Sequence, residues 1–300
     1  MKKFLALVLP LLLCATMAFA DVSDNAGTAG AVFLKIPVSA RASAMGDAFV
    51  SLTNDANAIY WNPAGLTKVE GTSISFTHQD LITDIAYEYI GGAFKLDFGT
   101  LGFGVSYLHM GDIDKTTAVE PDGTGETFTS TDMAIAVAAA KMFGDISFGL
   151  SLKYISEKID DASASTPALD IGLGYMMNEN LSLGLAITNI GGTLKWDEES
   201  DPLPMTVKAG IGYMMMDGDL VLSLDLNAPS DADIRGGFGV EYTIAKMIAI
   251  RAGYKVGYDI YDMTAGIGIK YGNFAFDFAY VPVSEDLFGN TQKFSLSFEF

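Results

Sequence analysis

Large apolar residues alternate with small or polar ones through most of the chain, and the pattern is clearest in the last nine residues. From Phe294 to Phe300 every second residue is large and apolar, whereas Lys293, Ser295 and Glu299 stand in the other phase. A period of two is that of a β-strand whose two faces meet different surroundings. The aromatic end of this row resembles the end of outer-membrane barrel strands, and the alternative is an edge strand of a soluble sandwich.

The same alternation recurs after Gly71 and predicts fourteen strands. Regular apolar rows occupy 74–76, 101–107, 146–154, 169–175, 181–187, 207–213, 220–226, 238–242, 248–254, 265–271, 274–280 and 294–300, and less regular strands are expected at 85–96 and 133–142. In the segment 85–96 the row changes phase at Gly91 and Gly92, which predicts a β-bulge. Half of the chain is apolar, but no segment after Leu13 approaches the twenty apolar residues of a spanning helix.

The connections between these rows differ in length in an ordered way. Tight turns are expected at 97–100, 143–145, 177–180, 216–219, 244–247 and 271–273. Long loops are expected at 109–127, 157–167, 189–204 and 281–291, and loops of medium length at 227–233 and 256–261. Only the first connection, at 81–84, is short where a long loop is due. An even number of strands, with tight turns on one rim and long loops on the other, is typical of bacterial outer-membrane barrels, whose tight turns face the periplasm.

Charged residues within the predicted strands avoid the aromatic phase. They are Glu88, Lys153, Asp170, Lys208, Asp225, Glu241, Arg251, Lys270, Asp277, Lys293 and Glu299. A Lys or Arg that faced lipid at the bilayer midplane would cost about 2 to 4 kcal/mol, so this phasing favours a polar lumen and a lipid-facing exterior. A soluble sandwich would also place its charges in one phase, but it would not need the ordered connection lengths.

We therefore predict an all-β fold, a fourteen-stranded antiparallel transmembrane β-barrel over residues 70–300, with residues 21–69 as an N-terminal plug or cap. Closure of the barrel leaves no unpaired strand edge in the hydrocarbon. Glu241 and Arg251 are nearly equidistant from the turn at 244–247, so they should be cross-strand neighbours in the lumen. Asp225 and Arg235 should meet likewise near the outer rim.

The first twenty residues have the pattern of a signal peptide. Lys2 and Lys3 precede an apolar run that ends at Leu13, and Ala18 and Ala20 supply the small residues of a cleavage site. The mature chain is then expected to begin at Asp21 in the cell envelope. The alternative is a lipoprotein cut before Cys14, although Leu13 stands where a small residue is expected. Cys14 is the only cysteine, so cleavage leaves no disulfide framework.

The remaining polar clusters do not predict enzymatic chemistry. The formal charge of −19 argues against nucleic acid as a partner. Both histidines, His78 and His109, continue the outward phase and are interpreted as interface residues, and there is no G-x-S-x-G motif of a hydrolase. The G-x-G pairs 172–174 and 266–268 lie within strands, and the acidic run 197–201 lacks fixed metal-ligand spacing. We expect no catalytic residues, no cofactor and no metal.

The N-terminal element, 21–69, lacks sustained alternation and carries two motifs. Arg41-Ala-Ser-Ala-Met45-Gly46 precedes Trp61-Asn62-Pro63-Ala64-Gly65-Leu66. This arrangement resembles the PorV/PorQ family, relatives of the FadL fatty-acid transporters, in which an R-x-x-x-M-G segment leads into W/Y-N-P-A-G-L. The resemblance implies an outer-membrane barrel of fourteen strands whose N-terminal segment enters or caps the lumen. The positions that it carries over are Arg41, Met45, Gly46, Trp61, Asn62, Pro63, Ala64 and Gly65.

The residues of this element also predict burial. Pro63 restricts its own φ and that of Asn62, so 62–65 should form a rigid turn, placed at the periplasmic end of the barrel. Residues 40–52 are compatible with a helix. We expect the lumen to bury the apolar side chains of this element, which are Phe33, Ile36, Met45, Phe49, Ile59, Tyr60 and Trp61. Arg41 is expected to pair with a lumen carboxylate such as Asp170 or Asp277.

The resemblance leaves three functions open. Secretion members of the family resemble a carrier that delivers type IX cargo from the translocon to the cell surface. The fatty-acid relatives instead pass hydrophobic solutes into the barrel wall, and a purely structural barrel is the third possibility. The implied partners are outer-membrane lipid together with a secretion translocon and its cargo, or a hydrophobic solute.

Overall fold

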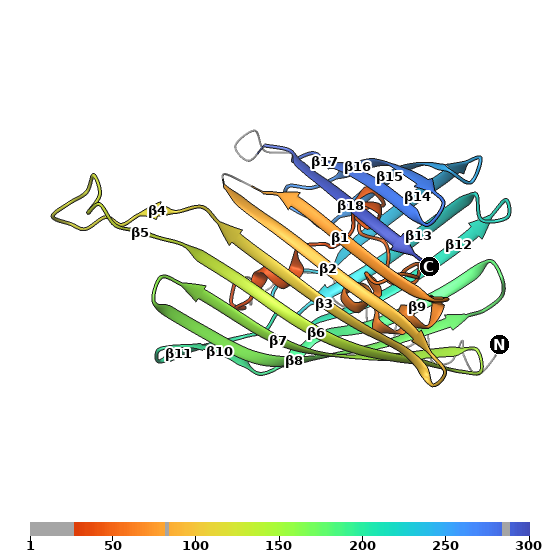
Figure 1. Ribbon diagram of the computed structural model, residues 1–300, viewed down its shortest axis with the longest axis horizontal. Coiled ribbons are helices and arrows are strands. Elements are labelled where there is room, and N and C mark those ends of the chain that lie inside the picture. Colours follow the sequence, from red (N-terminus) through yellow and green to blue (C-terminus); the bar gives the residue numbers. More distant parts are fainter. Residues whose placement is uncertain (1–26, 82–83, 284–288) are drawn as a thin grey trace.

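The computed structural model describes residues 27–81, 84–283 and 289–300, so the predicted signal peptide and its cleavage site lie outside the described residues. Fourteen antiparallel strands form a closed barrel (Figure 1). The barrel strands are β1 (Thr72–Asp80), β2 (Ile85–Leu96), β3 (Gly99–Met110), β6 (Ser130–Phe143), β7 (Ile146–Ile159), β8 (Ala162–Met176), β9 (Leu181–Gly191), β12 (Thr206–Met215), β13 (Leu220–Pro229), β14 (Arg235–Ile244), β15 (Ile248–Val256), β16 (Met263–Tyr271), β17 (Phe274–Val281) and β18 (Thr291–Glu299). The fold class predicted from alternation is confirmed.

Most of the barrel strands place their apolar row outside and their small or charged row inside. In β7 Leu152 is 66% exposed and its neighbour Ser151 is 1% exposed. In β15 the same contrast separates Ile250, which is exposed, from Arg251, which is buried. The outer rows form the apolar surface that a transmembrane barrel presents to lipid. Among the described residues, no helix is long and apolar enough to cross a membrane.

The predicted bulge in β2 is wrong. The pairing of β2 with β1 and with β3 continues through Gly91 and Gly92 without a change of register. Tyr87 and Tyr89 therefore face the lumen, where both are buried, and Glu88 faces outward. The prediction assumed that large aromatic residues face lipid. It failed because these two tyrosines pack against the N-terminal element, which supplies an apolar surface inside the barrel.

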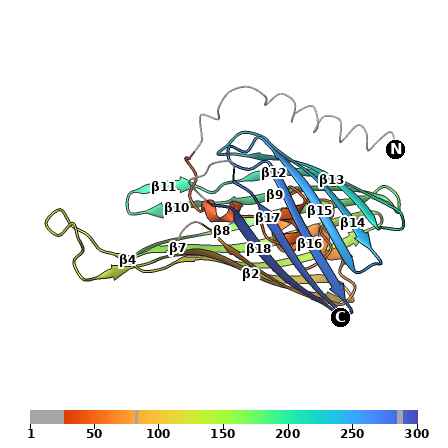
Figure 2. The same ribbon diagram turned by 90° about the horizontal axis from the view of Figure 1, so that it is seen from above.

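The long loop predicted at 157–167 is also wrong. Strands β7 and β8 continue toward each other, so that Asp160, with φ 52°, and Asp161 alone connect them. Small inner-phase residues such as Ala164 and Thr166 are buried in this extension. Two other long connections form hairpins of their own, β4 (Ile113–Asp114) with β5 (Thr127–Phe128) and β10 (Thr193–Trp196) with β11 (Glu199–Pro202). Both hairpins project from the rim opposite the C-terminus (Figures 1 and 2).

The N-terminal element lies inside the barrel (Figure 1). Its helices are short: η1 (Val32–Lys35), α2 (Ala40–Ala44), α3 (Ala58–Trp61) and η2 (Pro63–Lys68). The helix compatible with 40–52 ends at Ala44, because Gly46 and Asp47 adopt φ values of 66° and 60°. Of the apolar side chains expected to need cover, Phe33, Met45, Phe49, Ile59 and Trp61 are buried, whereas Ile36 and Tyr60 are partly buried.

Candidate functional site

The N-terminal element approaches the strands so closely that backbone touches backbone. A Cβ atom added to Gly237 of β14 would lie 2.1 Å from the carbonyl oxygen of Gly46, and one added to Gly253 of β15 would lie 2.1 Å from its nitrogen. Gly46 itself has φ 66°, a conformation that favours glycine. Gly46, the glycine of the R-x-x-x-M-G motif, therefore contacts Gly237 and Gly253 directly. A side chain on any of the three would push the N-terminal element away from the strands.

Arg41 joins the N-terminal element to the barrel through one carboxylate. Its guanidinium donates two hydrogen bonds to Glu241, at 2.8 and 2.7 Å. Glu241 also accepts from Nε of Arg251 at 2.5 Å, and Arg251 reaches Asp277 at 2.7 Å. The partner of Arg41 is thus Glu241 rather than Asp170 or Asp277. The pair is bidentate, with one nitrogen of the guanidinium on each carboxylate oxygen, which is a strong and directional arrangement.

The two expected pairs of lumen charges have different outcomes. Glu241 lies opposite Arg251 in the β14–β15 register, as predicted. Asp225 and Arg235 do not pair, because Arg235 lies opposite Asn227 and Asp225 opposite Gly237. The prediction assumed that residues at equal distance from the connection 227–233 lie opposite each other. The observed register of β13 with β14 is shifted from that position. One carboxylate oxygen of Asp225 instead accepts hydrogen bonds from the backbone amides of Phe49 and Val50, at 2.6 and 2.7 Å.

The N-P-A-G turn lies near the rim of tight turns. The side chain of Asn62 accepts a hydrogen bond from the amide of Ala64 at 3.1 Å. Its amide group donates to the carbonyl oxygens of Val50 and of Leu173 in β8, both at 3.0 Å. A Cβ on Gly65 would lie 2.6 Å from the side chain of Thr53, so glycine is required there for close packing. Asn62 thereby ties the turn, the rest of the element and the barrel wall together.

Trp61 and Met45 complete the interior of the element. Nε1 of Trp61 donates to the carbonyl oxygen of Val38 at 3.0 Å, and its ring meets those of Phe49 and Tyr60 edge-on. Met45 is fully buried in the same cluster. All eight residues of the two motifs therefore lie within the element or at its contact with the barrel. None of them forms a nucleophile or acid–base arrangement.

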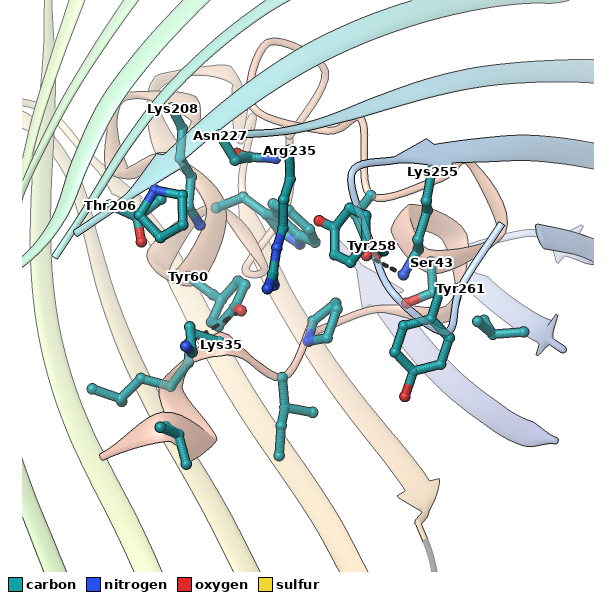
Figure 3. Close-up of a pocket in the computed structure, with 18 of the residues that line it drawn as sticks. Lys35, Ser43, Tyr60, Thr206, Lys208, Asn227, Arg235, Lys255, Tyr258 and Tyr261 are labelled. Atoms are coloured by element: carbon teal, nitrogen blue, oxygen red, sulfur yellow. Dashed lines mark hydrogen bonds and ion pairs between the residues drawn. The ribbon is translucent and has the colours of Figure 1, made fainter. Parts of the chain in front are cut away.

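A cavity of about 260 Å³ remains between this element and the ends of the strands on the long-loop rim. Tyr60 and Trp61 of the N-terminal element line it, as do Tyr258 and Tyr261 from the connection between β15 and β16. Figure 3 shows Tyr60, Tyr258 and Tyr261 around it. Five cationic side chains line it: Lys35, Lys208, Arg235, Lys255 and Lys293. The sequence marked Lys208 and Lys293 as inner-phase charges and placed Arg235 in the lumen. It could not show that residues from several distant segments converge on one cavity.

Other sequence candidates carry no site in the described part of the chain. The acidic run 197–201 lies in the β10–β11 hairpin, and no group of three or more His, Cys, Asp or Glu side chains among the described residues could hold a metal ion. His78 and His109 both contact the outward-facing Glu88, at 3.2 and 3.0 Å. The glycines at 172–174 and 266–268 lie in β8 and β16. Gly172 and Gly266 make room for the N-terminal element, whereas Gly268 makes room for the side chains of Arg251 and Asp277.

Comparison with protein families matches residues 19–227 to the family described as "Type IX secretion system protein PorV". The match spans more than half of the chain. The chain belongs to the PorV family. It is therefore an outer-membrane barrel of the type IX secretion system. Proteins of the PorV family are generally non-enzymatic. A comparison with curated proteins found no match.

Solved structures with the same fold as this PorV-family chain include transporters. The toluene transporter TbuX of Ralstonia pickettii is 14% identical, with a TM-score of 0.69 over 90% of this chain and 100% of that chain. The toluene transporter TodX of Pseudomonas putida is 13% identical, with a TM-score of 0.63 over 87% and 97% of the two chains. A Pseudomonas aeruginosa FadL homologue is 12% identical, with a TM-score of 0.53 over 94% and 99%. At these identities the likeness concerns the fold alone.

Proposed function

We propose that the protein serves type IX secretion as a barrel closed by its N-terminal element, and that it holds secreted cargo or translocon proteins at its outer rim. The filled lumen is the observation that carries this proposal. Backbone contacts at Gly46, the Arg41–Glu241 pair and the anchored turn at Asn62 bind the element to different parts of the wall. A folded protein cannot pass through a barrel filled in this way, so its contacts must form outside the lumen.

The outer rim offers surface for such contacts. The β4–β5 hairpin extends far beyond the other strands (Figure 1). Its tip exposes Val119, which is 89% accessible, among acidic residues such as Glu120 and Asp122. An exposed apolar residue with charged neighbours is a suitable contact for a protein partner, because it contributes burial while the charges select the orientation.

Site-specific photo-crosslinking in native membranes tests the role. A photoreactive residue at Val119 should give adducts with secreted or translocon proteins, and the same proteins should co-purify in mild detergent. The matched control is Met216, which is also exposed but lies in a tight turn on the opposite rim. Equal adducts at both positions, or purification with lipid alone, would refute a role at the outer rim.

A channel for hydrophobic solutes is the second candidate. The similarity of fold to TbuX and TodX favours it, and so does the cavity beside Tyr60 and Trp61. Reconstituted liposomes distinguish the two candidates. The secretion role predicts toluene entry no faster than in protein-free liposomes, whereas the channel predicts saturable entry that depends on the protein.

A further inference from the structure

The cavity on the long-loop side of the N-terminal element holds more positive than negative charge. Of its five cations, Lys35 is paired with Asp231 and Lys255 with Asp47, both at 2.5 Å. Within the described residues, no carboxylate forms an ion pair with Lys208, Arg235 or Lys293. This excess stands out in a chain whose formal charge is −19.

The unpaired cations lie against rings and polar groups that do not neutralise them. Nζ of Lys208 is 5.0 Å from the ring centre of Tyr60 and 5.2 Å from that of Trp61. The guanidinium of Arg235 lies 4.9 Å from the ring centre of Tyr258, and its buried Nε has no hydrogen-bond partner in the described part of the chain. Lys293 donates to the carbonyl oxygen of Pro37 and to Oγ of Ser43.

Lys208 and Arg235 are partly buried and Lys293 is fully buried. Burying a cation without a counter-charge costs free energy, and a bound anion removes that cost. Lys208 and Arg235 both project into the cavity, Arg235 between Tyr60 and Tyr258 (Figure 3). A guanidinium with a free Nε can bind two oxygens of one anion. The cavity of about 260 Å³ is smaller than the roughly 300–1,000 Å³ of sites for drug-sized ligands, so the bound group must be compact.

We propose that this cavity is a binding site for a compact anion with two negative charges, of the phosphate monoester class, in which Lys208 and Arg235 contact the anionic oxygens and Lys293, which also lines the cavity, contributes positive charge. The group can belong to a free solute or to a lipid headgroup that enters from the outer rim. The site does not depend on the secretion role, since it needs only the folded barrel.

Binding to the purified full-length protein tests the site with two probes, glycerol phosphate in solution and short-chain phosphatidic acid in micelles. Isothermal titration should show one saturable site that weakens as salt is raised. Lys208→Gln and Arg235→Gln should each weaken binding about tenfold, while Lys246→Gln, which removes an exposed lysine in a turn on the opposite rim, should leave it unchanged.

The two probes separate the sources of the anion. Saturable binding of glycerol phosphate assigns the site to soluble phosphate esters, and binding of phosphatidic acid alone assigns it to lipid headgroups. Heat-modifiable migration on gels verifies that each variant is folded. Absence of saturable binding for both probes, or unchanged binding in both folded cavity variants, overturns the proposal. Crosslinking at Val119 reports on secretion separately, so the two proposals can fail independently.

Discussion

Glu241 is the residue at which the barrel and its contents share one charge network. It lies in β14, is buried, and binds Arg41 from the N-terminal element as well as Arg251 from β15. Removing one partner of a buried ion pair leaves the other charged groups without compensation, which is more costly than losing an exposed pair. The network should therefore contribute to holding the element in place.

Glu241→Gln should lower the free energy of unfolding by about 3 to 5 kcal/mol, because two guanidinium groups lose their common carboxylate. Denaturant unfolding in detergent measures the loss, followed by tryptophan fluorescence in a Trp196→Phe background so that Trp61 inside the element is the reporter. Glu299→Gln makes the same chemical change in the exposed pair with Lys270, 3.3 Å long, and should cost at most about 1 kcal/mol. Equal losses in the two variants would contradict the structural role of the network.

Lys68 predicts a dependence on pH. Burial lowers its pKa to about 8, with a smaller contribution from the charge of Arg41. The unfolded chain therefore holds this proton to higher pH than the folded one, and stability should rise as pH increases through 8 toward the ordinary lysine value. The difference in unfolding midpoint between wild type and Lys68→Met should shift in favour of wild type from pH 7 to pH 10. A difference that does not change with pH would show that burial of the charged Lys68 side chain does not destabilise the folded state.

At the scale of elements, the N-terminal element has little regular structure and depends on the barrel wall for its shape. Its longest helix, η2, contains six residues, and helices this short are marginal without tertiary contacts. Hydrogen bonds from Asn62 and close contacts at Gly46 and Gly65 replace helical regularity. The element should loosen as a unit when its anchors are removed, without unfolding the strands.

The double substitution Asn62→Ala and Pro63→Ala should raise the permeability of the barrel to small solutes or abolish the secretion phenotype. It removes the bonds to Val50 and Leu173 and the restriction of the turn. Liposome swelling measures permeability, and heat-modifiable migration should stay as in wild type. Asn178→Ala, which removes a cap of a tight turn outside the lumen, is the matched control. Wild-type permeability and secretion in the double variant would show that the turn has no gating role.

At the scale of the whole molecule, closure depends on the joint between the first and last strands. The backbone of Phe300 donates to Thr72 at 2.9 Å and accepts from it at 2.6 Å, and its ring packs against Phe298. The contact lies on the tight-turn rim and completes the β1–β18 register. Closure satisfies backbone groups that lipid cannot.

Deletion of Phe300 should therefore impair assembly, with loss of heat-modifiable migration and of protease resistance in the outer-membrane fraction. Phe300→Tyr keeps the backbone bonds and an aromatic ring, so it should assemble as wild type does. Gel migration of both variants from isolated membranes makes the comparison. Normal assembly of the deletion variant would refute the role of the terminal residue.

Alternation determined the number of barrel strands and the face of most side chains, because the direction of a side chain in a strand is a local property with period two. Together with the ordered connection lengths it also predicted a closed antiparallel barrel. It also predicted the Glu241–Arg251 contact, which lies close to a tight turn that sets the register. The N-terminal motifs likewise pointed to the segment that occupies the lumen.

Only the tertiary structure decided what meets inside the barrel. Tyr87 and Tyr89 face inward because they pack against the N-terminal element. Arg41 binds Glu241 because the chain that follows α2, at Met45 and Gly46, lies directly on β14 and β15. The cationic cavity joins Lys35, Lys208 and Arg235 across some two hundred residues of chain. Such contacts depend on register and on the path of a segment with little regular structure, and neither is encoded in a local repeat.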